Sequence, residues 1–321
     1  MEIKGNLMTV REDIRILDAT IRDGGLVNDF YFSDDFVRAL YQANIEAGVD
    51  YMEFGYKADD KIFDRSKFGK WKFCDDEDIR AIVGDNDSPL KISVMADVGR
   101  CDFKKDIIDK KNSPIDLIRI ATYINTMPEA IEMIEYAHDK GYQTTCNIMA
   151  ISRAKEKDIE IALDMLAKSN VDGVYIVDSY GALCFIEIND LAVAYLNALT
   201  PAGKFVGVHA HNNMQNAFSN TVAAMSFGVS FVDATVNGMG RGAGNCALES
   251  LLGFFRNPKY SMNPILKFIQ QYMLDLRKTC TWGYDIPYLI TGLTNNHPRT
   301  AIAAIKENDT DYFSFYQNIL D

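Results

Sequence analysis

Short apolar runs, rich in β-branched and aromatic residues, alternate with longer amphipathic runs along most of this chain. A short apolar run between turn residues is typical of a buried strand, whereas apolar residues recurring every three to four positions indicate a helix. The runs that we interpret as strands are Ile14–Thr20, Tyr51–Tyr56, Lys91–Asp97, Leu117–Tyr123, Gln143–Ile148, Gly173–Asp178, Phe205–His211 and Phe231–Asn237. The runs that we interpret as helices are Ser33–Ala47, Met127–Lys140, Lys155–Ser169, Phe185–Ala198, Met214–Phe227 and Cys246–Arg256.

Eight strands alternating with helices over ~240 residues predict an α/β fold, a (β/α)8 TIM barrel. A doubly wound open sheet is the alternative, because it also buries parallel strands on both faces. Polar residues at the ends of the predicted strands favour the barrel, since a barrel brings all strand ends to one mouth. We therefore expect a barrel domain over residues 1–257. A small helical extension, 258–321, is expected to follow.

Charge and cysteine content narrow the class of protein. The chain has 321 residues and a net charge of −12, which argues against nucleic acid or an anionic membrane surface as the main partner. Its six cysteines form no C-x-x-C pair and fit reduced thiols in a cytoplasmic protein. The first 15 residues lack the apolar core of a signal peptide, and no apolar run approaches the ~20 residues of a membrane span.

Two of the four histidines end one predicted strand, in the sequence Val208-His209-Ala210-His211. Residues two apart in a strand point to the same face, so both imidazoles can reach one ion. A pair of ordinary polar residues at a strand end is the alternative. From this segment alone, metal ligation and an ordinary polar strand end are about equally supported.

The first predicted strand ends in a charged segment that contains Asp18, Thr20, Arg22 and Asp23. Alternation in a strand would direct the first three side chains into the barrel, with Asp23 just beyond the strand. One interpretation is an Asp–Arg ion pair that closes the barrel. The other is that Asp23 shares a metal ion with the histidines while Arg22 holds an anion.

A glycine-rich segment, Asn237–Glu249, follows the eighth predicted strand. Its glycines permit tight turns and close backbone approach to a ligand. It is either a phosphate-binding loop, a loop that presents Asn245 to a metal, or a turn that leads into a helix. In the last case Glu249 would complement the helix dipole.

Together, three motifs resemble the DRE-TIM metallolyases: residues 18–24 (Asp-Ala-Thr-Ile-Arg-Asp-Gly), residues 209–212 (His-Ala-His-Asn) and the loop 240–245. That family includes 4-hydroxy-2-oxovalerate aldolase, 3-hydroxy-3-methylglutaryl-CoA lyase, isopropylmalate synthase and the carboxyltransferase domain of pyruvate carboxylase. The resemblance covers roughly residues 14–256 and implies a TIM barrel. It implies Asp23, His209 and His211 as metal ligands, Asn245 as a further residue at the metal, and Arg22 as the cation that stabilises an enolate. Glu53 matches a strand-end position of the family, and we expect it at the catalytic site.

The chain also departs from the family. Residues 24–28 contain no histidine where the hydroxy-oxovalerate aldolases carry their acid/base histidine. We expect Tyr284, Tyr288 or a metal-bound water to move the proton instead, although helical packing is the simpler role for the aromatic residues and His297 of the tail. The glycine loop lacks the reactive cysteine of the lyase branch, and the tail is shorter than that of the synthases.

The resemblance therefore implies an aldolase or lyase of the 4-hydroxy-2-oxovalerate aldolase type that forms a pyruvate-type enolate from a small 2-oxo acid and an aldehyde. The alternatives are a Claisen-type acyltransferase that joins acyl-CoA to a 2-oxo acid, and a metal-binding barrel without catalysis. The mixed nitrogen and oxygen ligands suit Mn2+, Mg2+, Co2+ or Zn2+ and do not decide among them. We expect Mn2+ or Mg2+ first, with Zn2+ or Co2+ as further options. The sequence does not determine the oligomeric state, and a homo-oligomer is compatible with it.

Overall fold

The protein is described by a computed structural model that covers residues 10–320. Eight parallel strands close into a barrel in chain order, with the last strand pairing with the first. The strands are β1 Arg15–Asp18, β2 Tyr51–Tyr56, β3 Lys91–Asp97, β4 Leu117–Thr122, β5 Gln143–Ile148, β6 Gly173–Asp178, β7 Phe205–Ala210 and β8 Phe231–Ala234. The structure thus confirms the (β/α)8 barrel and excludes the open sheet.

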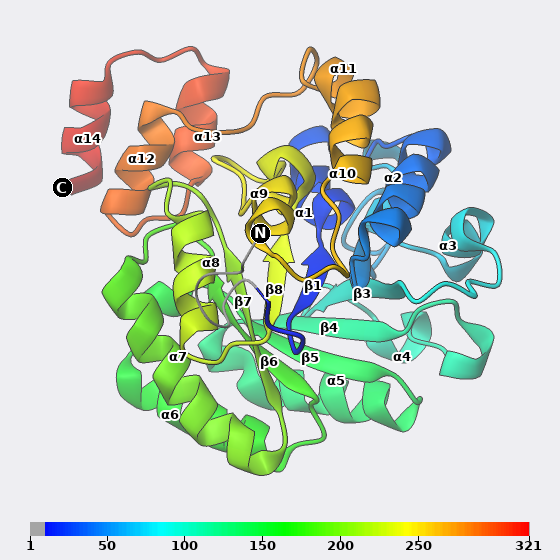
Figure 1. The fold of residues 1–321 in the computed structure, drawn as a ribbon. Coiled ribbons are helices and arrows are strands. Elements are labelled where there is room, and N and C mark those ends of the chain that lie inside the picture. The colour runs from blue at the N-terminus through cyan, green and yellow to red at the C-terminus, as the bar shows by residue number, and fades with distance from the viewer. Residues whose placement is uncertain (1–9, 321) are drawn as a thin grey trace.

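Helices surround the barrel on its outer side (Figure 1). They are α2 Asp34–Ala47, α3 Asp76–Val83, α4 Phe103–Asp106, α5 Met127–Asp139, α6 Glu156–Lys168, α7 Phe185–Leu199, α8 Ala217–Ser226 and α9 Leu248–Phe254. Helix α1, Thr20–Asn28, instead lies at the mouth of the barrel. Ser33 begins α2 by accepting a hydrogen bond from the Phe36 backbone nitrogen, and Gly48 ends it with a left-handed φ of 76°. None of the described helices is long and apolar enough to cross a membrane.

The beginning of the chain differs from the expected pattern. β1 ends at Asp18, and Thr20 and Arg22 belong to α1 rather than to the strand. Asp18 accepts hydrogen bonds from Thr20 and from the side chain of Asn44 in α2, so it faces the helical layer and not the barrel interior. The expectation that Asp18, Thr20 and Arg22 share one strand face is therefore wrong. The first backbone N–H groups of a helix have no carbonyl partner within that helix. Here the Asp18 carboxylate accepts from the Thr20 backbone nitrogen, and this hydrogen bond allows α1 to begin directly after β1.

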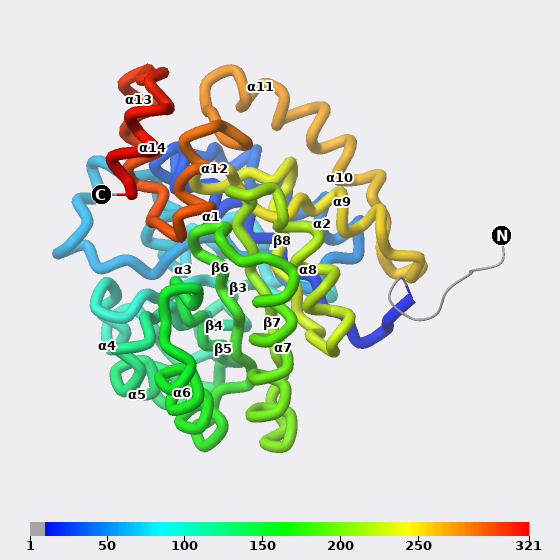
Figure 2. The backbone as a smooth tube through the Cα atoms, turned by 90° about the vertical axis from the view of Figure 1, so that its left-hand side faces the viewer, coloured from blue at the N-terminus to red at the C-terminus, as the bar shows by residue number. Residues whose placement is uncertain are grey.

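The remaining helices are α10 Asn263–Phe268, α11 Leu274–Leu276, α12 Ile286–Leu293, α13 Arg299–Lys306 and α14 Tyr312–Leu320. Figures 1 and 2 both place α12, α13 and α14 over one end of the barrel. This is the end where the strands terminate, because Asn295 exchanges hydrogen bonds with Ser152 after β5, and the Asn213 amide after β7 donates to the Tyr288 carbonyl. Residues 1–9, which begin the N-terminal segment analysed for a signal peptide, lie outside the described residues.

The barrel interior is layered along its axis. An apolar cluster of Leu17, Ala19, Tyr51 and Leu117 fills the end where the strands begin, with Phe231 packed against it. Two positions further along these strands lies a buried ionic layer of Glu53, Arg119 and Asp233. A cavity follows above this layer, at the mouth. The ionic layer therefore lies between the apolar core of the barrel and the cavity at its mouth.

Candidate metal centre and its cavity

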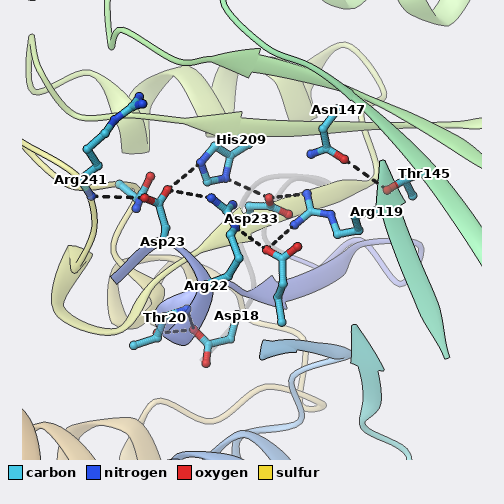
Figure 3. Close-up of polar contacts among 12 residues, drawn as sticks. Asp18, Thr20, Arg22, Asp23, Arg119, Thr145, Asn147, His209, Asp233 and Arg241 are labelled. Atoms are coloured by element: carbon cyan, nitrogen blue, oxygen red, sulfur yellow. Dashed lines mark hydrogen bonds and ion pairs between the residues drawn. The ribbon is translucent and has the colours of Figure 1, made fainter. Parts of the chain in front are cut away.

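Three predicted ligands lie together at the barrel mouth. One ligand atom of each of Asp23, His209 and His211 falls within 4.8 Å of the others, and all three residues are buried. His209 Nε2 is 3.2 Å and His211 Nε2 3.6 Å from the same carboxylate oxygen, Asp23 Oδ2. The first turn of α1 supplies Asp23, whereas β7 and the residue after it supply the histidines. Figure 3 shows Asp23 and His209 pointing toward one another.

The charges around the triad favour the metal-binding forms of Asp23 and His211. Burial opposes ionisation of Asp23, but the neighbouring Arg22, His211 and His209 outweigh it and hold its pKa well below the usual range. Burial and the cations Arg241, His209 and Arg22 together lower the pKa of His211 well below its usual value, despite Asp23. Asp23 is therefore an anion and His211 a neutral imidazole, which are the forms that bind a metal.

The glycine-rich loop after β8 positions Asn245 beside His211. It forms an isolated bridge with His211, and its side-chain nitrogen donates to the Met239 carbonyl at 3.3 Å. Its Oδ1 is buried and has no hydrogen-bond partner in the described part of the chain. A Cβ at position 240 would lie 2.0 Å from Asn245 Nδ2, so the loop requires glycine there to bring the amide in. An orphaned amide oxygen beside an imidazole–carboxylate triad fits a divalent cation, because such ions accept oxygen and nitrogen ligands together.

Arg22 and Glu53 connect the centre to the ionic layer. Arg22 Nε donates to Glu53 Oε2 at 2.7 Å, while Arg22 Nη1 lies 3.2 Å from Asp23 Oδ2. Arg22 also lines the cavity, so part of its guanidinium faces the space beside the triad. Glu53 is fully buried and does not line the cavity. Its carboxylate holds Arg22 in place.

Asp233 and Arg119, which were not among the predicted site residues, orient His209. Asp233 Oδ2 lies 2.9 Å from His209 Nδ1 and 2.6 Å from Arg119 Nη2. Arg119 Nη1 also donates to Glu53 Oε2 at 2.9 Å. Metal-binding histidines commonly donate their second ring nitrogen to a carboxylate, which fixes the ring and its tautomer. Single charged residues in the apolar runs of β4 and β8 were the signal that could have indicated Arg119 and Asp233.

The cavity lies between α1, the strand ends and the glycine loop. Its remaining lining residues are Leu26, Tyr56, Met95, Ala121, Asn147, Met149, Val177, Ser179 and Arg241. Tyr284 and Tyr288 do not line it. They line a neighbouring cavity that shares only Leu26 and Arg241 with the first. Tyr284 is half exposed, and Tyr288 packs beside Ala243 and Ala301.

The comparisons with known proteins agree with this architecture. The chain is 31% identical over 249 residues to an oxaloacetate decarboxylase of Mycobacterium tuberculosis, covering 76% of this chain and 70% of that protein. It is 28% identical over 248 residues to 4-hydroxy-2-oxovalerate aldolase 6 of Rhodococcus jostii, covering 77% and 68%.

Two solved structures share the fold. The N-terminal domain of a candidate aldolase from Bacteroides vulgatus superposes with a TM-score of 0.78 at 25% identity, covering 91% of this chain and 97% of that one. The HMG-CoA lyase of Brucella melitensis superposes with a TM-score of 0.66 at 16% identity, covering 83% and 99%. The HMGL-like family model matches residues 13–270. The chain therefore belongs to the HMGL-like family, the DRE-TIM group that its three motifs resemble.

Proposed function

We propose that this chain is a divalent-metal-dependent lyase that makes or breaks a carbon–carbon bond next to a 2-oxo acid, through a pyruvate-type enolate. The observation that carries the proposal is the buried Asp23–His209–His211 triad, with Arg22 facing the same cavity. The relatives named as 4-hydroxy-2-oxovalerate aldolases and oxaloacetate decarboxylase support it, because both names describe reactions that leave an enolate of pyruvate. We assign the enzyme to the cytoplasm.

The triad would hold the ion, with Asn245 Oδ1 as a further ligand. When bound, a divalent cation would act as a Lewis acid toward the carboxylate and keto oxygens of a 2-oxo acid. We propose Mn2+ or Mg2+ as the ion, with Zn2+ and Co2+ as alternatives, since the ligand set accepts all four. The ionic layer holds Arg22 beside Asp23, so that its guanidinium faces the place where negative charge develops.

Aldol cleavage requires two proton transfers, one from the hydroxyl on C4 and one to C3. In cleavage, the hydroxyl on C4 of the substrate loses its proton, the C3–C4 bond breaks, and its electron pair passes to the enolate. The aldehyde leaves, and protonation of C3 then gives pyruvate. Tyr284 and Tyr288 remain our candidates for this proton transfer, from the cavity next to the triad. Tyr56 is a third candidate, since it lines the triad's own cavity beside Arg22.

The test is proton NMR of pyruvate in D2O with chelator-treated protein, before and after addition of Mn2+ or Mg2+. For Mn2+, the protein is removed and the ion chelated before each spectrum, because Mn2+ broadens the signals. We expect metal-dependent loss of the methyl signal, because an enolate takes up deuterium at C3. Absence of exchange with every metal would refute the lyase proposal. Release of thiol from acetyl-CoA would then indicate the acyltransferase, and absence of both would indicate a binding barrel.

Three single variants test which tyrosine transfers the proton. Replacing Tyr56, Tyr284 or Tyr288 by Phe removes one hydroxyl and keeps the ring. We expect the variant that lacks the acid/base group to lose aldol cleavage while retaining metal binding. If all three variants keep full activity, none of these three tyrosines moves the proton.

A further inference from the structure

Arg241 is a cation at the barrel mouth that forms no ion pair with a carboxylate of residues 10–320. Its backbone nitrogen donates to Asp23 Oδ1 at 3.2 Å, and its Nη2 donates to the Ser179 carbonyl at 2.6 Å. Figure 3 shows the guanidinium reaching away from the Asp23 carboxylate. Its Nε is buried and has no hydrogen-bond partner among residues 10–320. A buried donor without a partner is costly unless a ligand supplies the acceptor.

Two more arginines lie near this place: Arg299 begins α13, and Arg153 lies between β5 and α6. Tyr180 follows Ser179, and its ring meets the His297 ring edge to face, with centroids 5.6 Å apart. His297 Nδ1 accepts from the backbone nitrogen of Arg299 at 3.1 Å. Arg153 reaches the same segment, donating from Nη1 to the Asn295 carbonyl at 2.9 Å.

The fields of these arginines overlap at Tyr180 and His297. Burial raises the pKa of Tyr180, and Arg153, Arg241 and Arg299 all oppose that rise. Burial together with Arg241 and Arg299 lowers the pKa of His297 to about 4, so the ring is neutral and adds no charge. None of the three arginines forms an ion pair with any residue between 10 and 320, although the chain carries a net charge of −12.

We propose that Arg241, with Arg299 and Arg153 beside it, binds a second anionic group of the substrate, a carboxylate or a phosphate carried by the aldehyde half. The planar guanidinium fork matches both groups, because each offers paired oxygen acceptors. Arg241 lines both cavities, so a substrate whose oxo-acid end lies at the triad can place its other end against this residue. The inference rests on the proposed function, and it makes the preferred aldehyde an anionic one.

The first experiment measures binding and needs no turnover. Isothermal titration calorimetry of the full chain uses glycerol 3-phosphate and succinate as anionic probes and glycerol as the uncharged one. We expect the anions to bind and glycerol not to bind. Arg241→Met, and separately the exposed Arg299→Gln, should weaken anion binding at least about tenfold, the cost of one lost charge-assisted contact. Arg256→Gln is the control, since it removes an equal charge from an exposed position, where Nη1 donates to the Gly253 carbonyl.

The second experiment measures substrate preference with pyruvate as the donor. The aldehyde pairs are succinic semialdehyde against butanal, and glyceraldehyde 3-phosphate against glyceraldehyde. We expect kcat/KM to favour the anionic member of one pair at least about tenfold, and that pair identifies carboxylate or phosphate. Arg241→Met should remove the preference, Arg241→Lys should restore part of it, and Arg256→Gln should keep it.

The two arms separate this inference from the proposed function. Metal-dependent deuteration of pyruvate with no anionic preference, and equal anion binding in all variants, would overturn the arginine site and leave the lyase intact. Absence of deuteration would overturn the lyase. Calorimetry would then still decide whether the arginines bind anions.

Discussion

His209 Nδ1 lies 2.9 Å from Asp233 Oδ2, and that same oxygen accepts from Arg119 Nη2 at 2.6 Å. One carboxylate oxygen therefore connects a predicted metal ligand to the buried ionic layer of the barrel. Burial disfavours ionisation of Asp233, but Arg119 and His209 outweigh it and lower its pKa. Asp233 is therefore a fixed anion that keeps the other ring nitrogen of His209 turned toward Asp23.

Replacing Asp233 by Asn should weaken metal binding without removing any proposed ligand. The neutral amide no longer supplies the negative charge that both donors bind, so the orientation of His209 is held less strongly. We expect about 10–100-fold lower metal affinity, measured by calorimetry with Mn2+. Asp164→Asn, on the exposed face of α6, is the matched control. Unchanged affinity in Asp233→Asn would remove this residue from the metal centre.

His209→Ala should abolish metal binding and turnover together. The substitution removes one of three proposed protein ligands and leaves the negative charge of Asp23 with less compensation. Metal content after dialysis, measured by mass spectrometry, and pyruvate deuteration provide the two readouts. His138→Ala, at an exposed position of α5, should keep both. Full activity in His209→Ala would refute the metal centre.

Arg22→Lys should keep the metal and lose most of the rate. Lysine retains the positive charge but cannot donate to Glu53 and face the cavity at the same time, as the guanidinium fork does. Loss of one preorganised donor costs roughly 10²–10³ in kcat. Steady-state kinetics measured beside a metal titration separate the two effects, and an unchanged kcat would exclude Arg22 from the reaction.

Arg119→Met should destabilise the fold strongly. It leaves the buried carboxylates of Glu53 and Asp233 without their shared cation. Breaking a buried ion pair from one side costs about 3–5 kcal/mol, so the urea midpoint should fall well below that of wild type. Arg38→Met, at an exposed position of α2, should change the free energy of unfolding by less than about 0.5 kcal/mol. If both variants unfold at the same urea concentration, the ionic layer does not contribute to stability.

Asp18→Asn should change how stability depends on pH. Burial raises the pKa of Asp18 to about 6, against the opposing hydrogen bonds from Thr20 and Asn44. The folded state then holds this proton more tightly than the unfolded state, so stability falls as pH rises from about 4 to 6. Asparagine removes this slope, and its amide can donate to Asn44 Oδ1, which has no partner in the described residues.

The measurement is urea unfolding of both proteins at several pH values from 4 to 7. We expect Asp18→Asn to gain about 2–3 kcal/mol relative to wild type across this range. The difference between the two proteins is the readout, because all other acids titrate equally in both. A difference that stays constant with pH would show that Asp18 has an ordinary pKa.

The sequence determined the fold because periodicity and turn residues are local properties. Four of the predicted strands have the bounds that the structure gives, for instance Tyr51–Tyr56 and Gly173–Asp178. The histidine pair was visible for the same reason, since alternation alone places both imidazoles on one face. The error at Asp18–Arg22 arose where a side-chain hydrogen bond begins a helix two residues after β1. The pattern of apolar residues does not predict this hydrogen bond between Asp18 and Thr20.

Only the tertiary structure decided which charges meet. Asp23 and His209 are 186 positions apart, and Arg119 and Asp233 are 114 apart. Closure of the barrel brings these pairs into hydrogen-bond distance. Tyr284 and Tyr288 are placed by how α12 lies over the mouth, which no strand or helix pattern specifies. Local patterns fix what each segment forms, whereas burial of several charges in one low-dielectric space depends on all eight strands at once.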